Sequence, residues 1–209
     1  MFKNIIFDLS EVIYYGYHGA ESTIEHSLNI PTSEFLKRKE ETLDFFLDTM
    51  RGKYSEDEYF IHLLEGMNWT VSVNDLKNHF RRSIEIPVEG TLDIIEELSS
   101  NNYKLILLSD YVKEWYDYKI SKDELSIFDD KYFSFQYNKL KKDEGIFEFI
   151  LNELNIKPEE TIFIDDYKNY TEKAEKSGIT GITFKNASQL RDDLNKLNVL
   201  PYNKEAIHC

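Results

Sequence analysis

The chain has 209 residues, of which 41% are apolar and 14% aromatic, with only 8 glycines and 4 prolines. This composition is typical of a globular protein with a buried core and excludes collagen-like and low-complexity sequences. Lysine and arginine total 25 against 39 aspartates and glutamates, which gives a formal net charge of −14. Such a charge repels the phosphates of nucleic acids, so we expect no nucleic-acid partner.

The sequence shows no sign of secretion or of a membrane anchor. The single cysteine, Cys209, cannot form a disulfide within the chain, and the apolar run after Met1 is shorter than a signal-peptide core. No apolar run approaches the roughly 18 residues that cross a bilayer. We therefore expect a cytoplasmic protein with no membrane partner, and the sequence leaves the oligomeric state open.

In chain order, the predicted elements begin with a short apolar run at 4–7, which indicates a buried strand. Helical periodicity fills residues 15–88, with two sequences that resemble capping boxes, Ser55-Glu56-Asp57-Glu58 and Ser72-Val73-Asn74-Asp75. The next predicted strands are 103–108, 132–135, 161–164 and 179–184, and helical patterns near 92–98, 146–154 and 170–177 alternate with them.

This alternation predicts an α/β fold with a parallel sheet. About 95 residues separate the first two strands, far more than the roughly 30 of an ordinary βαβ unit. We therefore expect a core domain made of residues 1–14 and 89–209, with a helical cap domain, residues 15–88, inserted into it.

Polar side chains follow three of the predicted strands. Asp8 follows the first, Ser109 and Asp110 end the second, and Asp165 and Asp166 end the fourth. In a parallel α/β sheet, ligands bind beyond the carboxyl ends of the strands. Each residue alone is more often a cap of the next helix or turn. Three such strand ends in one chain predict a functional site.

Together with Lys141, the order of these residues resembles the haloacid dehalogenase (HAD) superfamily over nearly the whole chain. The segment Lys141-Lys142-Asp143-Glu144-Gly145-Ile146-Phe147 is similar to the family's Lys-Pro-Asp-Pro-x-Ile-Phe. A second segment, Arg51-Gly52-Lys53-Tyr54-Ser55, resembles part of the cap in its sugar-phosphatase-like branch. The resemblance implies a HAD-like Rossmannoid parallel sheet with an inserted α-helical cap.

The resemblance also implies phosphoryl transfer through an aspartyl-phosphate, with Asp8 as the nucleophile. A carboxylate that attacks a phosphate dianion needs positive charge beside it, which Mg²⁺ supplies. The implied magnesium ligands are Asp8, the backbone carbonyl of Ser10, and Asp165 and Asp166. The implied substrate is a small phosphorylated metabolite.

Three further residues are implied at the phosphoryl group. Lys141 would neutralise Asp8 and a phosphoryl oxygen, and the Ser109 hydroxyl with the N–H of Asp110 would hold another oxygen. Taken alone, such a lysine is more often a solvated surface residue. The carboxylate of Asp110 would repel the phosphoryl group by roughly 3 kcal/mol at about 5 Å, unless it points away.

Ser10 stands where phosphatases of this family usually have a second Asp, which protonates the leaving oxygen and later activates water. A hydroxyl cannot do this near neutral pH, and positioned acid–base catalysis is worth about 10²–10⁴-fold. Tyr14 and His18 lie where the insert leaves the core and are candidates to replace the acid or to contact substrate. His18 has a suitable unperturbed pKa.

Two other hypotheses stay open. One is a catalytically weak or inactive relative that binds a phosphorylated ligand or a protein partner, as Ser10, Glu11 and Asp110 would allow. The other is a 2-haloacid dehalogenase, whose halide leaving group needs no proton. The pair Asp165-Asp166 argues against it, because the dehalogenases that it would resemble work without metal.

Overall fold

The structure, a computed structural model, describes residues 1–120 and 125–200, so Cys209 lies outside the described residues. Its centre is a sheet of parallel strands in the order β3-β2-β1-β4-β5. Their bounds are β1 (Asn4–Phe7), β2 (Lys104–Ser109), β3 (Asp130–Phe133), β4 (Thr161–Asp165) and β5 (Thr180–Thr183). The predicted parallel α/β fold is confirmed.

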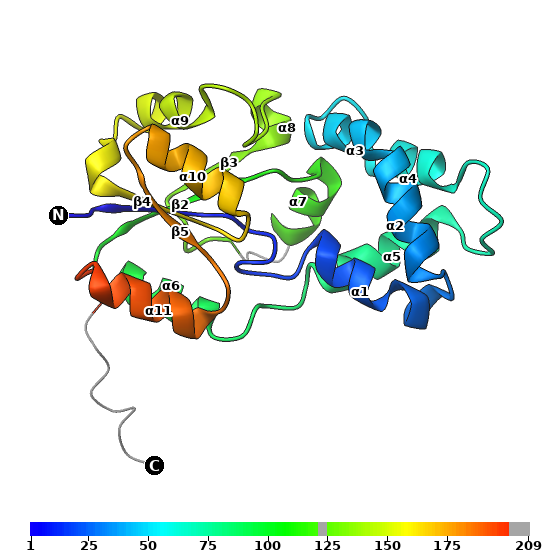
Figure 1. Cartoon of the computed structure of the whole chain (residues 1–209), viewed down its shortest axis with the longest axis horizontal. Helices are drawn as coiled ribbons and strands as arrows, with labels where there is room; N and C mark the ends of the chain where they lie inside the picture. The colour runs from blue at the N-terminus through cyan, green and yellow to red at the C-terminus, as the bar shows by residue number, and fades with distance from the viewer. Residues whose placement is uncertain (121–124, 201–209) are drawn as a thin grey trace, which may run out of the picture.

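Helices cover both faces of this sheet (Figure 1). One face carries α9 (Ile146–Leu154) and α10 (Lys168–Lys176), and the other carries α6 (Thr91–Ser100) and α11 (Ala187–Lys196). Side chains alternate along β1: Ile5 and Phe7 pack toward α6 and α11, and Ile6 packs toward α9. Because both faces are buried, the strands read as nearly continuous apolar runs.

The remaining helices of the α/β part are α7 (Lys113–Ile120), the short α8 (Ser134–Tyr137) and a 3₁₀ turn at Pro158–Glu160. Strand β3 ends two residues before the predicted end at 135, because α8 begins at Ser134. The side chain of Gln136 accepts a hydrogen bond from the N–H of Phe133 at 3.0 Å, and Ser134 Oγ donates to the Met50 carbonyl at 2.5 Å. These polar contacts end the strand.

Between β1 and α6 lie five helices: α1 (Tyr17–Leu28), α2 (Thr32–Glu41), α3 (Leu43–Met50), α4 (Glu56–Leu64) and α5 (Val73–Ser83). They form a group to one side of the sheet (Figure 1), and we call this group the cap. Both predicted capping boxes are present, with Ser55 and Glu58 at the start of α4 and Ser72 and Asp75 at the start of α5.

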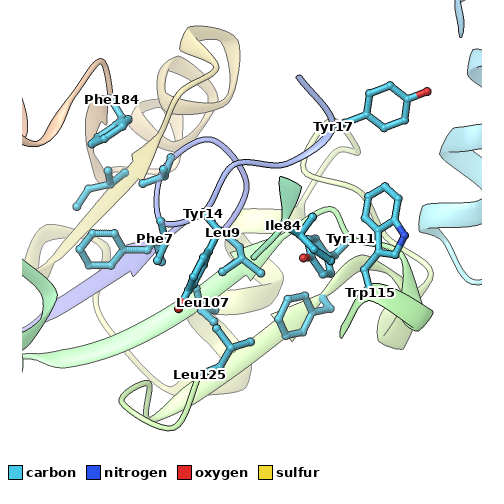
Figure 2. Close-up of a cluster of buried hydrophobic side chains, with 14 of the residues drawn as sticks. Phe7, Leu9, Tyr14, Tyr17, Ile84, Leu107, Tyr111, Trp115, Leu125 and Phe184 are labelled. Atoms are coloured by element: carbon cyan, nitrogen blue, oxygen red, sulfur yellow. The ribbon is translucent and has the colours of Figure 1, made fainter. Parts of the chain in front are cut away.

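One apolar cluster runs from the sheet into the cap. It passes from Phe7 and Leu107 in the strands through Leu9 and Tyr14, and Figure 2 shows these side chains in one continuous group. Trp115 of α7 lies where this cluster enters the cap: its ring stacks on Phe80 of the cap, and its Nε1 donates to Glu56 Oε1 at 2.8 Å. In the described part of the chain, no helix is long and apolar enough to cross a membrane.

Candidate active site

Asp8 immediately follows the end of β1, at the carboxyl edge of the sheet. It is 5% exposed, and its Oδ1 accepts a hydrogen bond from the N–H of Leu9 at 2.7 Å. Its Oδ2 lies 2.8 Å from Lys141 Nζ. Both oxygens of this buried carboxylate therefore have a fixed direction and a donor beside them.

Lys141 is the cation at the centre of the site. It is 3% exposed, and its Nζ contacts Asp165 Oδ2 at 2.6 Å as well as Asp8. Burial by itself lowers the pKa of Lys141, but the charges of Asp165, Asp8 and Asp110 outweigh burial and raise the pKa above its usual range. Lys141 is therefore charged at neutral pH and bridges two strand ends.

The loop that carries Lys141 is held from two sides. Asp110, which follows β2, accepts the N–H of Lys141 with Oδ1 at 3.0 Å and Oδ2 at 3.2 Å. Lys173 of α10 donates to the carbonyls of Lys141 at 3.3 Å and Lys142 at 2.7 Å, and also to that of Asp143. These bonds replace regular secondary structure and fix the direction of the Lys141 side chain.

Asp110 thus has a role that the sequence did not predict. Its carboxylate is occupied by the backbone of the Lys141 loop, although the residue also lines the cavity described below. Burial raises the pKa of Asp110 to about 6, against the lowering effect of Lys141. The repulsion that was expected from this carboxylate is reduced by its bonds to the loop.

Three carboxylates converge next to Lys141. One oxygen each of Asp8, Asp165 and Asp166 lie within 4.8 Å of one another. Asp165 is fully buried, and its Oδ1 accepts the N–H of Tyr167 at 2.8 Å. Burial and the charge of Asp8 raise the pKa of Asp166 to about 6, and they also raise that of Asp165. An all-oxygen, negatively charged cluster of this kind fits a hard divalent cation such as Mg²⁺.

The turn after Asp8 joins the site to the cap. Glu11 has a positive φ of 62°, and its Oε1 accepts the N–H groups of Gly16 at 2.9 Å and Gly19 at 3.1 Å, at the start of α1. Gly16 has to be a glycine, because a Cβ there would lie 2.8 Å from both Cβ and Oγ of Ser10. Glu11 therefore stabilises the first helix of the cap, a role that only the bonds to α1 reveal.

His18 lies in the first turn of α1 and borders the cavity described in the next paragraph. Its Nδ1 is 3.0 Å from Glu21 Oε2, and Lys39 of α2 pairs with the other carboxylate oxygen of Glu21. The bond to Glu21 raises the pKa of His18 against the opposing effects of burial and Lys39. The sequence did not predict roles for Glu21 or Lys39, although the i,i+3 spacing of His18 and Glu21 on a helix is a usable signal.

A cavity of about 420 Å³ lies between the sheet edge and the cap. Its volume is in the range of small-molecule sites. The α/β part contributes mainly charged residues, Asp8, Glu11, Asp110, Lys141, Lys142, Asp165 and Asp166, together with Ser10, Trp115, Tyr167 and Tyr170. The cap contributes Tyr17, His18, Lys39, Leu43, Phe46, Leu47 and Met50. The structure thus brings Asp8, Ser10, His18, Asp110, Lys141, Asp165 and Asp166 together around one space.

Two residues proposed from the sequence do not line this cavity. Ser109 is 1% exposed at the end of β2, and in the described part of the chain its Oγ has no hydrogen-bond partner. Tyr14 is buried, and the ammonium group of Lys119 lies 3.2 Å from the centre of its ring. The expectation that Tyr14 contacts substrate finds no support in this geometry, because its ring packs into the apolar cluster.

The cap also contacts the Lys141 loop directly. Arg51, which follows α3, forms a two-pronged ion pair with Asp143 through Nη1–Oδ2 at 2.5 Å and Nη2–Oδ1 at 2.7 Å. Asp143 Oδ2 accepts the N–H of Leu140 at 2.9 Å as well. Arg51, foremost, and the Leu140 N–H lower the pKa of Asp143 to about 2, against the effect of burial. The cap and the Lys141 loop are therefore joined by a charged contact.

Comparison with known structures gives close overall likeness. A structure described as a predicted HAD-like family hydrolase from Porphyromonas gingivalis has 26% identity and a TM-score of 0.74, and the match covers 95% of this chain and 98% of that one. A HAD family enzyme from Bacteroides thetaiotaomicron, in complex with magnesium and inorganic phosphate, has 22% identity and a TM-score of 0.70, with coverage of 89% and 96%.

The HAD-hydrolase YfnB from Bacillus subtilis, bound to magnesium, has 18% identity and a TM-score of 0.63, with coverage of 93% and 99%. These two less identical structures support the fold. No curated protein matches the chain in sequence. The sequence profile of the family described as haloacid dehalogenase-like hydrolase matches residues 4–184, which is most of the chain. The chain therefore belongs to the haloacid dehalogenase-like hydrolase family.

Proposed function

We propose that this hydrolase is a Mg²⁺-dependent phosphatase that acts on a small phosphorylated metabolite through an aspartyl-phosphate at Asp8. The observation that supports this most strongly is the buried Lys141 ammonium between Asp8 and Asp165, beside Asp166. A nucleophilic carboxylate, a fixed cation and a cluster of oxygen ligands are the parts that phosphoryl transfer needs. The solved complex of the Bacteroides enzyme with magnesium and phosphate is consistent with this chemistry.

In the first step, a carboxylate oxygen of Asp8 attacks phosphorus, and the bond from phosphorus to the substrate oxygen breaks. Lys141 and the Ser109 hydroxyl would bind the phosphoryl oxygens. Mg²⁺, held by Asp8, the Ser10 carbonyl, Asp165 and Asp166, would supply the positive charge that the two reacting anions require. Ser109 Oγ has no hydrogen-bond partner in the described part of the chain, and because the residue does not line the cavity, this bond requires a phosphoryl group that seats at the end of β2.

The leaving oxygen needs a proton, which Ser10 cannot supply. We assign this role to His18, whose pairing with Glu21 favours the protonated ring. In the second step, water attacks phosphorus and the bond to Asp8 breaks. His18, now neutral, takes the proton of that water, so that inorganic phosphate and the starting enzyme are produced.

The test is phosphate release from an aryl phosphate by the purified chain, with Mg²⁺ and with a chelator. We expect turnover only with the metal, none from Asp8→Asn, and full activity from the control Asp192→Asn, an exposed residue of α11. Unchanged turnover in Asp8→Asn would refute the assignment of the nucleophile.

The alternative is a catalytically weak or inactive relative that binds a phosphorylated ligand or a protein partner. One observation favours it: the Ser10 side chain packs against the backbone of Gly16 and carries no acid. Binding of inorganic phosphate without turnover on any phosphate ester would support this alternative. We keep the cytoplasm as the proposed compartment and propose no nucleic-acid or membrane partner.

A further inference from the structure

One helix of the cap presents apolar side chains to the catalytic cavity. Leu43, Leu47 and Met50 of α3 are spaced i, i+4 and i+7, so they lie on one face of the helix, and all three line the cavity. Leu43 is 42% exposed. Leu47 and Met50 are half-buried, and Met50 also packs against the apolar cluster. The part of this face that borders the cavity can bury an apolar part of a ligand.

The polar groups of the cap wall have partners within the cap, and the remaining ring nitrogen of His18 is assigned to the leaving oxygen. In the described part of the chain, the cap residues that line the cavity include no amide side chain, and their one hydroxyl, on Tyr17, pairs with that of Tyr59. His18 and Lys39 both bind Glu21. This wall therefore offers few partners for a set of ligand hydroxyl groups.

Trp115 of α7 completes this wall. Its indole N–H donates to the buried carboxylate of Glu56 at 2.8 Å, so it gives the cavity no hydrogen-bond donor. A ligand hydroxyl that packs against Leu43, Leu47 and Trp115 would lose its hydrogen bonds to water and gain no partner in the protein, which costs free energy. A CH₂ group in the same position would gain from burial instead.

We propose that the preferred substrates are phosphate monoesters of small alcohols with an apolar body, alkyl or aryl, and not polyhydroxylated sugar phosphates. This inference rests on the proposed phosphatase function, because it places the phosphoryl group at Asp8 and Lys141. The leaving group then extends across the 420 Å³ cavity toward α3. The segment 51–55, which resembles the cap of the sugar-phosphatase-like branch, is not part of the cavity lining.

The test compares cyclohexylmethyl phosphate with glucose 6-phosphate, two primary alkyl esters with six-membered rings that differ mainly in hydroxyl groups. With the Mg²⁺-loaded enzyme, we expect kcat/KM to be at least about tenfold higher for the cyclohexylmethyl ester. An equal value, or a preference for the sugar phosphate, would refute the inference while phosphatase function stands.

A pair of variants tests whether the α3 face causes the difference in kcat/KM between the two esters. Leu43→Gln should reduce the ratio of the two kcat/KM values at least about threefold. Leu36→Gln is the matched control, because Leu36 of α2 is 44% exposed and does not line the cavity, and it should leave the ratio unchanged. A ratio that changes equally in both variants, or in neither, would contradict the role of the α3 face.

Equilibrium binding of the same two esters to the Asp8→Asn protein compares their affinities for the cavity without turnover. Tighter binding of the cyclohexylmethyl ester, at least about tenfold, supports the inference. If no ester is hydrolysed by the native chain, the phosphatase function fails, and this binding measurement alone then decides whether the cavity selects apolar bodies.

Discussion

Ser10 determines what the other residues of the site must do. Its hydroxyl lies against Gly16 at the start of the cap and cannot exchange a proton with substrate near neutral pH. His18 is a candidate on the same stretch of chain, since it borders the cavity and pairs with Glu21, whereas Glu11 already accepts two N–H groups at the start of α1. The acid–base group of this site is thus expected to come from the cap instead of from the residue two places after Asp8.

His18→Gln should lower kcat on an alkyl phosphate by about 10²-fold or more, because an alkoxide leaving group requires protonation. In the native chain, activity should fall on the alkaline side as His18 loses its proton. Glu21, foremost, and Glu11 raise the pKa of His18, whereas burial and Lys39 lower it; the net effect is a pKa above 6.5. A pH–rate profile should therefore show this alkaline fall above pH 6.5, and the variant should lack it.

Two further variants separate catalysis from folding. Glu21→Gln should move the alkaline fall to lower pH, because the bond that raises the pKa of His18 is weakened. His26→Gln, an exposed residue of α1, should leave the profile as it is. A profile that is identical in the native chain, His18→Gln and Glu21→Gln would exclude the histidine from proton transfer.

At the level of single residues, the sequence predicted the site residues whose positions relative to strands and helices can be read along the chain. Asp8, Lys141, Asp165 and Asp166 follow strand ends or precede a helix, and the parallel sheet brings them together. The side-chain direction of Asp110 could not be predicted, because it depends on a loop 31 residues away. Such contacts are decided by tertiary packing and not by local sequence.

At the level of elements, the contact between α3 and the Lys141 loop is the main new feature. The ion pair of Arg51 with Asp143 joins residues 92 positions apart, one after a cap helix and one in the loop that carries Lys141. Ser134 of α8 also donates to the carbonyl of Met50, the last residue of α3. The position of the cap is therefore linked to the loop that holds Lys141.

Asp143→Asn should lower the free energy of unfolding by roughly 1–2 kcal/mol at pH 7, because a two-pronged ion pair is lost. The pKa of Asp143 is lowered to about 2 in the folded chain, from 3.8. A carboxylate with a lowered pKa stabilises the fold above its unfolded pKa, and this contribution is lost as pH falls through the folded pKa. The difference between the two proteins should thus shrink between pH 4 and pH 2.

Urea unfolding at several pH values measures this difference. The control is Asp117→Asn, which removes a pair with Lys113 that is exposed on both sides, and it should change stability by less than about 0.5 kcal/mol. Equal effects of Asp143→Asn and Asp117→Asn at pH 7 would show that the contact between cap and loop adds nothing beyond a surface pair.

Elements with a strong local signal were predicted well. The capping boxes at Ser55 and Ser72 start α4 and α5 because each pairs a hydroxyl with an acid three residues later. The predicted strand at 132–135 was shifted from Asp130–Phe133, since the apolar residue Phe135 belongs to α8 and packs on Phe133. A short apolar run does not reveal where a side-chain hydrogen bond ends a strand.

At the scale of the whole molecule, the negative net charge favours the binding of a metal cation and opposes the binding of an anionic substrate. The net charge is −14, and the cavity is lined by five carboxylates of its α/β part, Asp8, Glu11, Asp110, Asp165 and Asp166, against lysines 39, 141 and 142. Such a field attracts Mg²⁺ and repels a phosphate dianion, so metal binding should precede substrate binding.

The affinity for Mg²⁺ should therefore fall as salt rises. The Debye length is about 30 Å at 0.01 M ionic strength and about 8 Å at 0.15 M, so added KCl screens the charges beyond the direct ligands. We expect the Mg²⁺ concentration that half-saturates thermal stabilisation to rise several-fold over this range. Asp165→Asn should abolish the stabilisation, and a midpoint independent of salt would contradict the argument from net charge.

The central claim is that Asp8 becomes covalently phosphorylated. The most direct measurement is a rapid acid quench of the chain mixed with Mg²⁺ and a ³²P-labelled aryl phosphate, followed by mapping of the labelled residue. We predict label on Asp8 within the first turnover, none in Asp8→Asn, and none when a chelator replaces Mg²⁺. Phosphate release without label on Asp8, or label that persists in Asp8→Asn, would contradict the account.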